Sequence, residues 1–168
     1  MSRPKAAPTR RAPVIEIMIE SPLWKAHRSL KALLRRAVAE AATLLPRTQG
    51  ALAIVLTDDS AIRALNRTWR GKDEPTNVLS FPARGRSKHE LHLLGDIVIA
   101  HETAAREAAA EGKRLQDHLA HLVVHGFLHL LGYDHDTNRD AAAMERLEIA
   151  VLRRLDIPNP YVARGAKG

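Results

Sequence analysis

Hydrophobic residues follow the pattern of β-strands in the first part of this chain and the pattern of helices in the last part. This order restricts the fold more than any other feature of the sequence. The alternating or continuously apolar stretches typical of β-strands all lie before residue 101. Segments with the 3.6-residue period of helices fill nearly all of the chain after it. Strands early and helices late predict an α+β domain, in which a small mixed sheet of four strands packs with about five helices.

The boundaries of these elements follow from the same patterns. The predicted strands cover residues 14–20, 51–57, 78–81 and 95–100, and the predicted helices cover residues 24–45, 58–69, 101–111, 115–131 and 139–155. Alternation in the first strand places Ile15, Ile17 and Ile19 on one face. A turn-rich loop is predicted at 71–76 and a basic loop that contains glycine at 82–92.

Composition excludes several classes of site. The 168 residues suit one compact domain. They include no cysteine, which excludes a disulfide scaffold, a thiol nucleophile, a thiolate zinc finger and an iron–sulfur cluster. The lack of cysteine fits a reducing cytoplasm, which is the predicted location. No apolar run approaches the roughly 20 residues that span a bilayer, and residues 1–13 lack the apolar segment of a secretory signal, so no membrane partner is expected.

The positive charge gathers at the two ends of the chain. The formal net charge is +7, and residues 1–13 and 161–168 carry basic side chains without a single acidic one. We therefore expect a flexible basic tail at 1–13, a single domain at 14–158 and a C-terminal tail at 159–168. Basic tails contact nucleic acid or serve only for solubility, and the sequence leaves both open.

A stripe of histidines marks the helix predicted at 115–131. At 100° per residue, His118, His121, His125 and His129 fall within an arc of about 80°. A single histidine on a helix is usually a surface or core residue, and packing is the simpler reading for the first two of these. A contact with substrate or with the metal ligands is the alternative for these two.

Three of the histidines have the spacing of metal ligands. His125 and His129 are one helical turn apart, so both imidazoles can reach the same ion. Gly132 is suited to end the helix and to return His135 toward them. Three nitrogens around one point match a catalytic zinc site, which keeps its fourth position for water. Imidazoles also bind nickel and copper well, so the residues alone leave the metal open.

The run from His125 to His135, HGFLHLLGYDH, overlays the zinc-binding pattern of the metzincin proteases. The overlay fails at the glutamate that acts as general base in those enzymes, because Gly126 occupies its position. Asp134 and Asp136 are the nearest carboxylates that could replace it. A metalloprotease or another hydrolase that uses the same metal is thus disfavoured.

Three runs in the sequence resemble the YbeY family of ribosomal RNA maturation factors. HGFLHLLGYDH resembles the family's signature, and LNRTWRGKDEPTNVLSFP, residues 65–82, resembles its second motif. The run LLGDIVI, residues 93–99, also fits. The order and spacing of the three agree with the family over about residues 52–155, which is most of the domain.

This resemblance implies a metal-dependent endoribonuclease that cuts single-stranded RNA. It implies action in ribosomal RNA maturation, including the 3′ end of the small-subunit RNA, and in ribosome quality control, with the ribosome or its small subunit as partner. It further implies one Zn²⁺ per chain on His125, His129 and His135. Arg70, in the second motif, is implied as a catalytic or RNA-contacting residue, and its guanidinium could stabilise the charge that develops on phosphorus.

Further candidates and one further alternative remain. His121, Asp134 and Asp96 are candidates for contact with the metal ligands or with substrate. The alternative is a ribosome assembly factor in which zinc is only structural. A closed fourth coordination position would favour it, and Asp134 beside His135 is the only close carboxylate that the motif offers.

Overall fold

The computed structural model describes residues 12–83 and 92–162. Its helices and strands follow one another as β1 (Val14–Ile19), a short 3₁₀ turn (Pro22–Trp24), α1 (Leu30–Leu44), β2 (Ala51–Thr57), α2 (Asp59–Arg70), β3 (Val78–Pro82), β4 (Leu93–Ala100), α3 (His101–Ala110), α4 (Leu115–Leu130) and α5 (Asn138–Arg154). The order of elements is the one that the hydrophobic periodicities predict.

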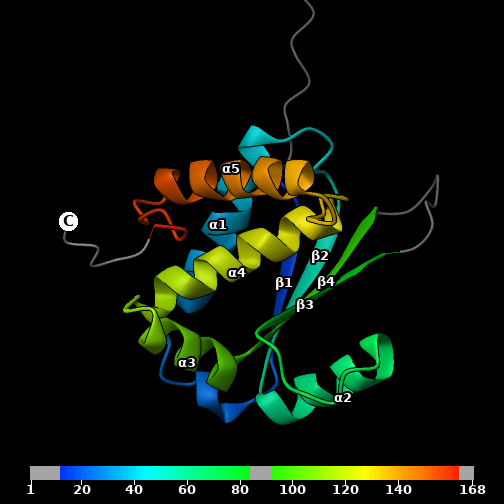
Figure 1. The fold of residues 1–168 in the computed structure, drawn as a ribbon, viewed down its shortest axis with the longest axis vertical. Helices are drawn as coiled ribbons and strands as arrows, with labels where there is room; N and C mark the ends of the chain where they lie inside the picture. Colours follow the sequence, from blue (N-terminus) through cyan, green and yellow to red (C-terminus); the bar gives the residue numbers. More distant parts are fainter. Residues whose placement is uncertain (1–11, 84–91, 163–168) are drawn as a thin grey trace, which may run out of the picture.

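The four strands form one mixed sheet in the order β1-β2-β4-β3. β1, β2 and β4 run parallel to one another, and β3 runs antiparallel to β4 at the edge. In Figure 1, α4 lies on one side of the strands and α2 on the other. The predicted α+β class, with one small domain, a four-stranded mixed sheet and five helices, is confirmed.

Helix α4 is the centre of the larger core. Its buried residues face both the sheet and the helices α1 and α5, so it is apolar on nearly every side except for its histidines. The smaller core lies on the other face of the sheet, where Ile62 of α2 packs with Leu79 and Val98. The four histidines therefore lie on a helix that is packed on several sides, which suits a site that needs fixed side-chain positions.

Gly126 brings α4 close to the sheet. A Cβ atom at this position would lie 2.9 Å from Cγ2 of Ile97 and 3.0 Å from Oγ of Ser80. The helix can pack at this depth only because residue 126 has no side chain. The same contact explains why the glutamate of the metzincin pattern is absent, since a glutamate side chain has no space here.

The first predicted helix is wrong at its beginning. Instead of a helix from residue 24, the structure has a 3₁₀ turn capped by Ser21, and α1 begins only at Leu30. Trp24 is 2% exposed and its indole Nε1–H donates to the carbonyl oxygen of Thr57 at 2.8 Å. This long-range bond fixes the chain before α1, and periodicity within one segment cannot reveal it. The buried positions within α1 agree with the prediction.

Two further predictions need correction. Ile19 was expected on the buried face of the first strand, yet it is 45% exposed because β1 is an edge strand and ends there. The C-terminal tail was expected to begin at residue 159, but the Nζ of Lys113 donates to the carbonyl oxygen of Pro160, and Tyr161 is bonded to α5. Residues 159–162 are thus attached to the domain.

Other predicted segments lie outside the described residues. They are the N-terminal tail at 1–11, the centre of the basic loop at 84–91 and the chain end at 163–168. Within the described part, every helix is too short or too polar to cross a bilayer.

Candidate metal centre

The structure brings His125, His129 and His135 together. One ring nitrogen of each lies within 4.8 Å of the other two, and the Nε2 atoms of His125 and His129 are 3.0 Å apart. The rings of His125 and His129 meet edge to face with centroids 4.6 Å apart, and His135 stacks on His125 at 5.8 Å. The predicted gathering of these three residues is therefore found.

Local backbone geometry produces this cluster. His125 and His129 are separated by one turn of α4 and project from the same face. Gly132 has a φ of +98°, a conformation that favours glycine, and it turns the chain so that His135 returns to the helix. Its N–H donates to the carbonyl oxygen of His129 at 3.0 Å and so closes the end of the helix.

The protonation of His129 suits a ligand. Burial lowers its pKa, and the neighbouring imidazoles of His125 and His135 lower it further. A neutral imidazole keeps a lone pair that a metal can accept. Zinc binds imidazole nitrogen at about 2.0–2.1 Å, so three imidazoles gathered this closely can hold one metal ion.

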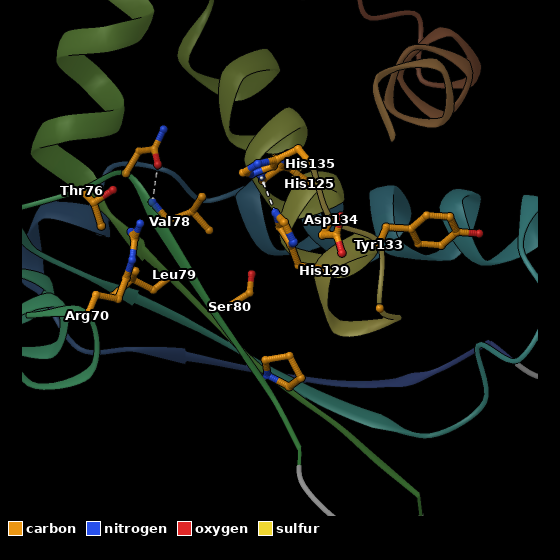
Figure 2. Close-up of a pocket in the computed structure, with 13 residues that line it drawn as sticks. Arg70, Thr76, Val78, Leu79, Ser80, His125, His129, Tyr133, Asp134 and His135 are labelled. Carbon is orange, nitrogen blue, oxygen red and sulfur yellow. Dashed lines mark hydrogen bonds between the residues drawn. The ribbon is translucent and has the colours of Figure 1, made fainter. Parts of the chain in front are cut away.

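The histidines form one wall of an open cleft of about 560 Å³. The opposite wall consists of Arg70, at the end of α2, and the first residues of β3. Figure 2 shows Arg70 across the cleft from the three histidines, with Ser80 between the two walls. Within the described residues, the guanidinium of Arg70 has no hydrogen bond or ion pair, so it is available to an anion in the cleft.

Gly71 determines where Arg70 stands. It adopts a φ of +69° and ends α2, and its N–H donates to the carbonyl oxygen of Arg67 at 3.1 Å. Asn66 is buried, and its Nδ2 donates to the carbonyl oxygen of Glu74 at 2.9 Å, which holds the following loop against the helix. The cationic wall is therefore built by a helix end and an anchored loop.

The other two histidines of the stripe have separate contacts. His118 is buried and its Nε2 lies 3.1 Å from Oε1 of Glu107 on α3. His121 lies nearer the metal cluster, with its Nε2 3.4 Å from Oε1 of Glu148 and 3.3 Å from the hydroxyl of Tyr161. His118 thus serves packing, as the simpler reading predicts, whereas His121 contacts a neighbour of the cluster.

The two candidate aspartates lie in different places. Asp134 lines the cleft beside His135, although it is not part of the ligand cluster. Asp96 does not lie with the histidines, so the prediction that it contacts the metal ligands is wrong. Alternate residues of a strand point to opposite faces. Ile97 packs beneath α4, so Asp96 lies on the other face, in a groove with Trp69 and Phe81.

One acidic residue of the site was missed by sequence reasoning. Glu148 of α5 is 0% exposed, and the Nδ1–H of His125 donates to its Oε1 at 2.6 Å. Burial acts to raise the pKa of Glu148, but hydrogen bonds from His121, His125 and Tyr161 outweigh it and lower the pKa to about 2. A signal existed in the sequence, because Glu148 shares the helical face of the buried Met144 and Val151.

Comparisons with known proteins agree over most of the chain. Residues 18–156 match the family described as Endoribonuclease YbeY. A protein of that name from Nitrobacter winogradskyi is 50% identical over 156 residues, which is 89% of this chain and 82% of the relative. Another from Bradyrhizobium diazoefficiens is 47% identical over 159 residues, with 90% and 87% of the two chains covered.

A solved structure supports the fold. A Thermotoga maritima protein, whose structure was determined in solution, superposes with a TM-score of 0.53 at 23% identity. The match covers 92% of this chain and the whole of that one. With the matched residues and the identities above, the chain belongs to the YbeY endoribonuclease family.

Proposed function

We propose that this protein is a zinc-dependent endoribonuclease that cuts single-stranded RNA during ribosomal RNA maturation. The observation that carries the proposal is the cleft itself, in which a three-imidazole cluster faces a guanidinium that has no ion pair among the described residues. Such a pair of walls suits the cleavage of a phosphodiester, because a metal on one side and a cationic donor on the other can both stabilise the charge that develops on the phosphate oxygens. Membership of the YbeY family supports RNA as the substrate.

The residues of the cleft have two roles, metal binding and phosphate binding. His125, His129 and His135 would hold the ion, which when bound supplies a Lewis acid for a phosphoryl oxygen and an activated water. Arg70 binds the phosphate by two parallel N–H donors of its cationic guanidinium. The cleft is open to solvent, so a flexible single strand can enter it.

Two observations disfavour the alternative functions. Position 126 has no space for the glutamate base of a metzincin protease, because the sheet lies against the helix there. A structural zinc needs four protein ligands. Among residues 12–83 and 92–162, the cluster offers three, and no carboxylate oxygen belongs to the group of ligand atoms.

The family resemblance extends the proposal to the ribosome. We propose the 3′ end of the small-subunit ribosomal RNA as the site of action, with a role in ribosome quality control and the ribosome or its small subunit as partner. A cytoplasmic location goes with these partners. The substrate test is a single-stranded RNA that extends past that mature 3′ end, compared with an unrelated strand of equal length.

The first prediction tests the metal site. The purified parent protein should contain about one zinc per chain and cleave end-labelled single-stranded RNA, but not the same strand in a duplex. His129→Ala removes one of three ligands and should abolish both the bound zinc and the cleavage while the circular dichroism spectrum stays that of the parent. Metal content is measured by atomic emission on the same samples.

His92→Ala is the matched control, because His92 is an exposed histidine outside the cluster. It should keep the metal content and cleavage rate of the parent. Stoichiometric zinc in His129→Ala, or full cleavage in the presence of excess chelator, would contradict the proposal.

A further inference from the structure

We infer that Glu148 is a positioning residue for the proposed metal site: held by Tyr161 from the C-terminal segment, it fixes His125 in the tautomer that presents Nε2 to the metal. The inference rests on the proposed function only in taking the three histidines as ligands. It concerns α5 and the residues after it, none of which belongs to the cleft.

The geometry begins with the two nitrogens of His125. Its Nδ1 lies 2.6 Å from Oε1 of Glu148, and its Nε2 lies 3.0 Å from Nε2 of His129, in the cluster. A neutral imidazole carries one proton, on one nitrogen or the other. A carboxylate can only accept, so the proton must be on Nδ1 and the lone pair is left on Nε2, where a metal would sit.

Burial makes this arrangement rigid. The side chain of Glu148 is 1% exposed and that of His125 is 26% exposed, so water does not compete freely for the bond between them. α5 carries Glu148 on the face that packs against α4. The carboxylate therefore reaches His125 from inside the core, on the side away from the cleft.

The C-terminal segment secures the second oxygen of Glu148. The hydroxyl of Tyr161 donates to Oε2, and Nε2 of His121 lies 3.4 Å from Oε1. The Nζ of Lys113 donates to the carbonyl oxygen of Pro160 at 3.0 Å and ties the same segment to the body. Residues 159–162 thus orient the carboxylate, although they do not line the cleft.

Charge gives Glu148 a second effect. Three neutral imidazoles leave a divalent ion with its full charge of two, and a buried anion one imidazole away offsets part of it. In the metal-free protein there is no such positive charge for the carboxylate to stabilise. The carboxylate therefore favours the metal-bound state. Partners of this kind typically change metal affinity by about 10- to 100-fold.

The test substitutes the carboxylate without changing its shape. In the full chain, Glu148→Gln should raise the dissociation constant for zinc about 10- to 100-fold in a competition titration with a chromophoric chelator. In the metal-free protein, nitrogen-15 spectra of the histidine side chains should show His125 protonated at Nδ1 in the parent. The variant should shift that proton toward Nε2, which a merely structural role of Glu148 would not do.

Glu107→Gln is the matched control. Glu107 also accepts from a histidine of α4, since Nε2 of His118 lies 3.1 Å from its Oε1, but His118 is not in the cluster. The control should keep the parent's zinc affinity and the parent's His125 spectrum. Equal losses of affinity in both variants would overturn the inference, because they would report a general effect on α4.

A second variant keeps the inference testable if Glu148→Gln fails to fold. Tyr161→Phe removes one hydroxyl from a partly exposed side chain at the end of the domain, and it should weaken zinc binding several-fold with a smaller shift of the His125 proton. Parent-like affinity and tautomer in Tyr161→Phe, or in a folded Glu148→Gln, would overturn the inference.

These measurements contain no RNA, which separates the two proposals. A parent protein that binds zinc but leaves RNA intact would contradict the proposed function and leave the positioning role standing. A parent that binds no zinc would overturn both.

Discussion

The two walls of the cleft carry side chains that bind different kinds of ligand. Burial and its neighbours lower the pKa of His129, so this ring is neutral at physiological pH and can bind a metal. The guanidinium of Arg70 is a cation that has only N–H donors, so it suits an anion. A phosphate that enters the cleft therefore meets a metal-binding wall and an anion-binding wall.

The prediction at this scale concerns Arg70. Arg70→Glu should abolish RNA cleavage with zinc still bound, because the residue is not a ligand and the new carboxylate repels phosphate. Arg70→Lys keeps the charge but loses the planar pair of donors, and we expect a loss of about 10²-fold in single-turnover cleavage at saturating enzyme.

Arg67→Lys is the comparison for Arg70→Lys. Arg67 lies one turn earlier on α2 and does not line the cleft, so this variant should cleave close to the parent rate. Cleavage by Arg70→Glu at the parent rate would show that Arg70 is only a surface residue.

At the scale of elements, the N-terminal ends of α2 and α3 are bonded to each other. Asp59, in the first turn of α2, accepts from the backbone N–H of Thr103 at 3.0 Å and from its hydroxyl at 2.7 Å. Glu102, in the first turn of α3, accepts in return from the backbone N–H of Asp59 at 2.9 Å. Each helix thus supplies the acidic cap of the other, and α2, which carries Arg70, is fixed to the body at its far end.

This pair of caps predicts a pH-dependent contribution to stability. Burial acts to raise the pKa of Asp59, but hydrogen bonds from Thr103 and Arg106 outweigh it and lower the pKa below its ordinary value. A carboxyl with a lowered folded-state pKa stabilises the protein above its unfolded pKa of about 3.9. The contribution disappears as the pH falls through the folded-state pKa. Asp59→Asn should lower the free energy of unfolding by about 1–2 kcal/mol at pH 7 and by much less near pH 3, measured in urea.

Asp58→Asn is the control for this prediction. Asp58 caps α2 within its own helix through the N–H of Ala61, and asparagine serves that position about as well as aspartate. It should change the stability little at either pH. An equal loss for Asp59→Asn at pH 7 and pH 3 would show that charge is not the reason for the stabilisation.

The whole molecule carries most of its excess charge at its ends. The net charge is +7, and residues 1–13 contain Arg3, Lys5, Arg10 and Arg11 with no acidic side chain. If the proposed RNA substrate meets this segment as well as the cleft, each phosphate contact releases counterions. The affinity for single-stranded RNA should then fall as the salt concentration rises. In a plot of the logarithm of the binding constant against the logarithm of the salt concentration, each contact contributes about 0.7 to the steepness of the slope.

Deletion of residues 1–13 should reduce that slope by up to about 3, which is four contacts at 0.7 each. The measurement is a fluorescence anisotropy titration between low and high potassium chloride, with a chelator present to prevent cleavage. Unchanged affinity and slope would mean that the basic segment serves solubility alone.

Much of this architecture follows from local pattern. The strands, the five helices and the cluster of His125, His129 and His135 are predictable because each depends on spacing within a few turns of the chain. A strand alternates with a period of two and a helix repeats every 3.6 residues. Two histidines one turn apart therefore lie together wherever that helix packs, and Gly132 needs only its own backbone to return His135.

Tertiary structure decided the remainder, which depends on contacts between residues distant in sequence. The bond from Trp24 to Thr57 shortened the first predicted helix, and the pairing of β4 placed Asp96 on the face away from the histidines. The packing of α5 on α4 brought Glu148 to His125, 23 residues apart. A buried carboxylate is stable only beside the donors that the fold supplies, so its partner is known only once the helices are packed.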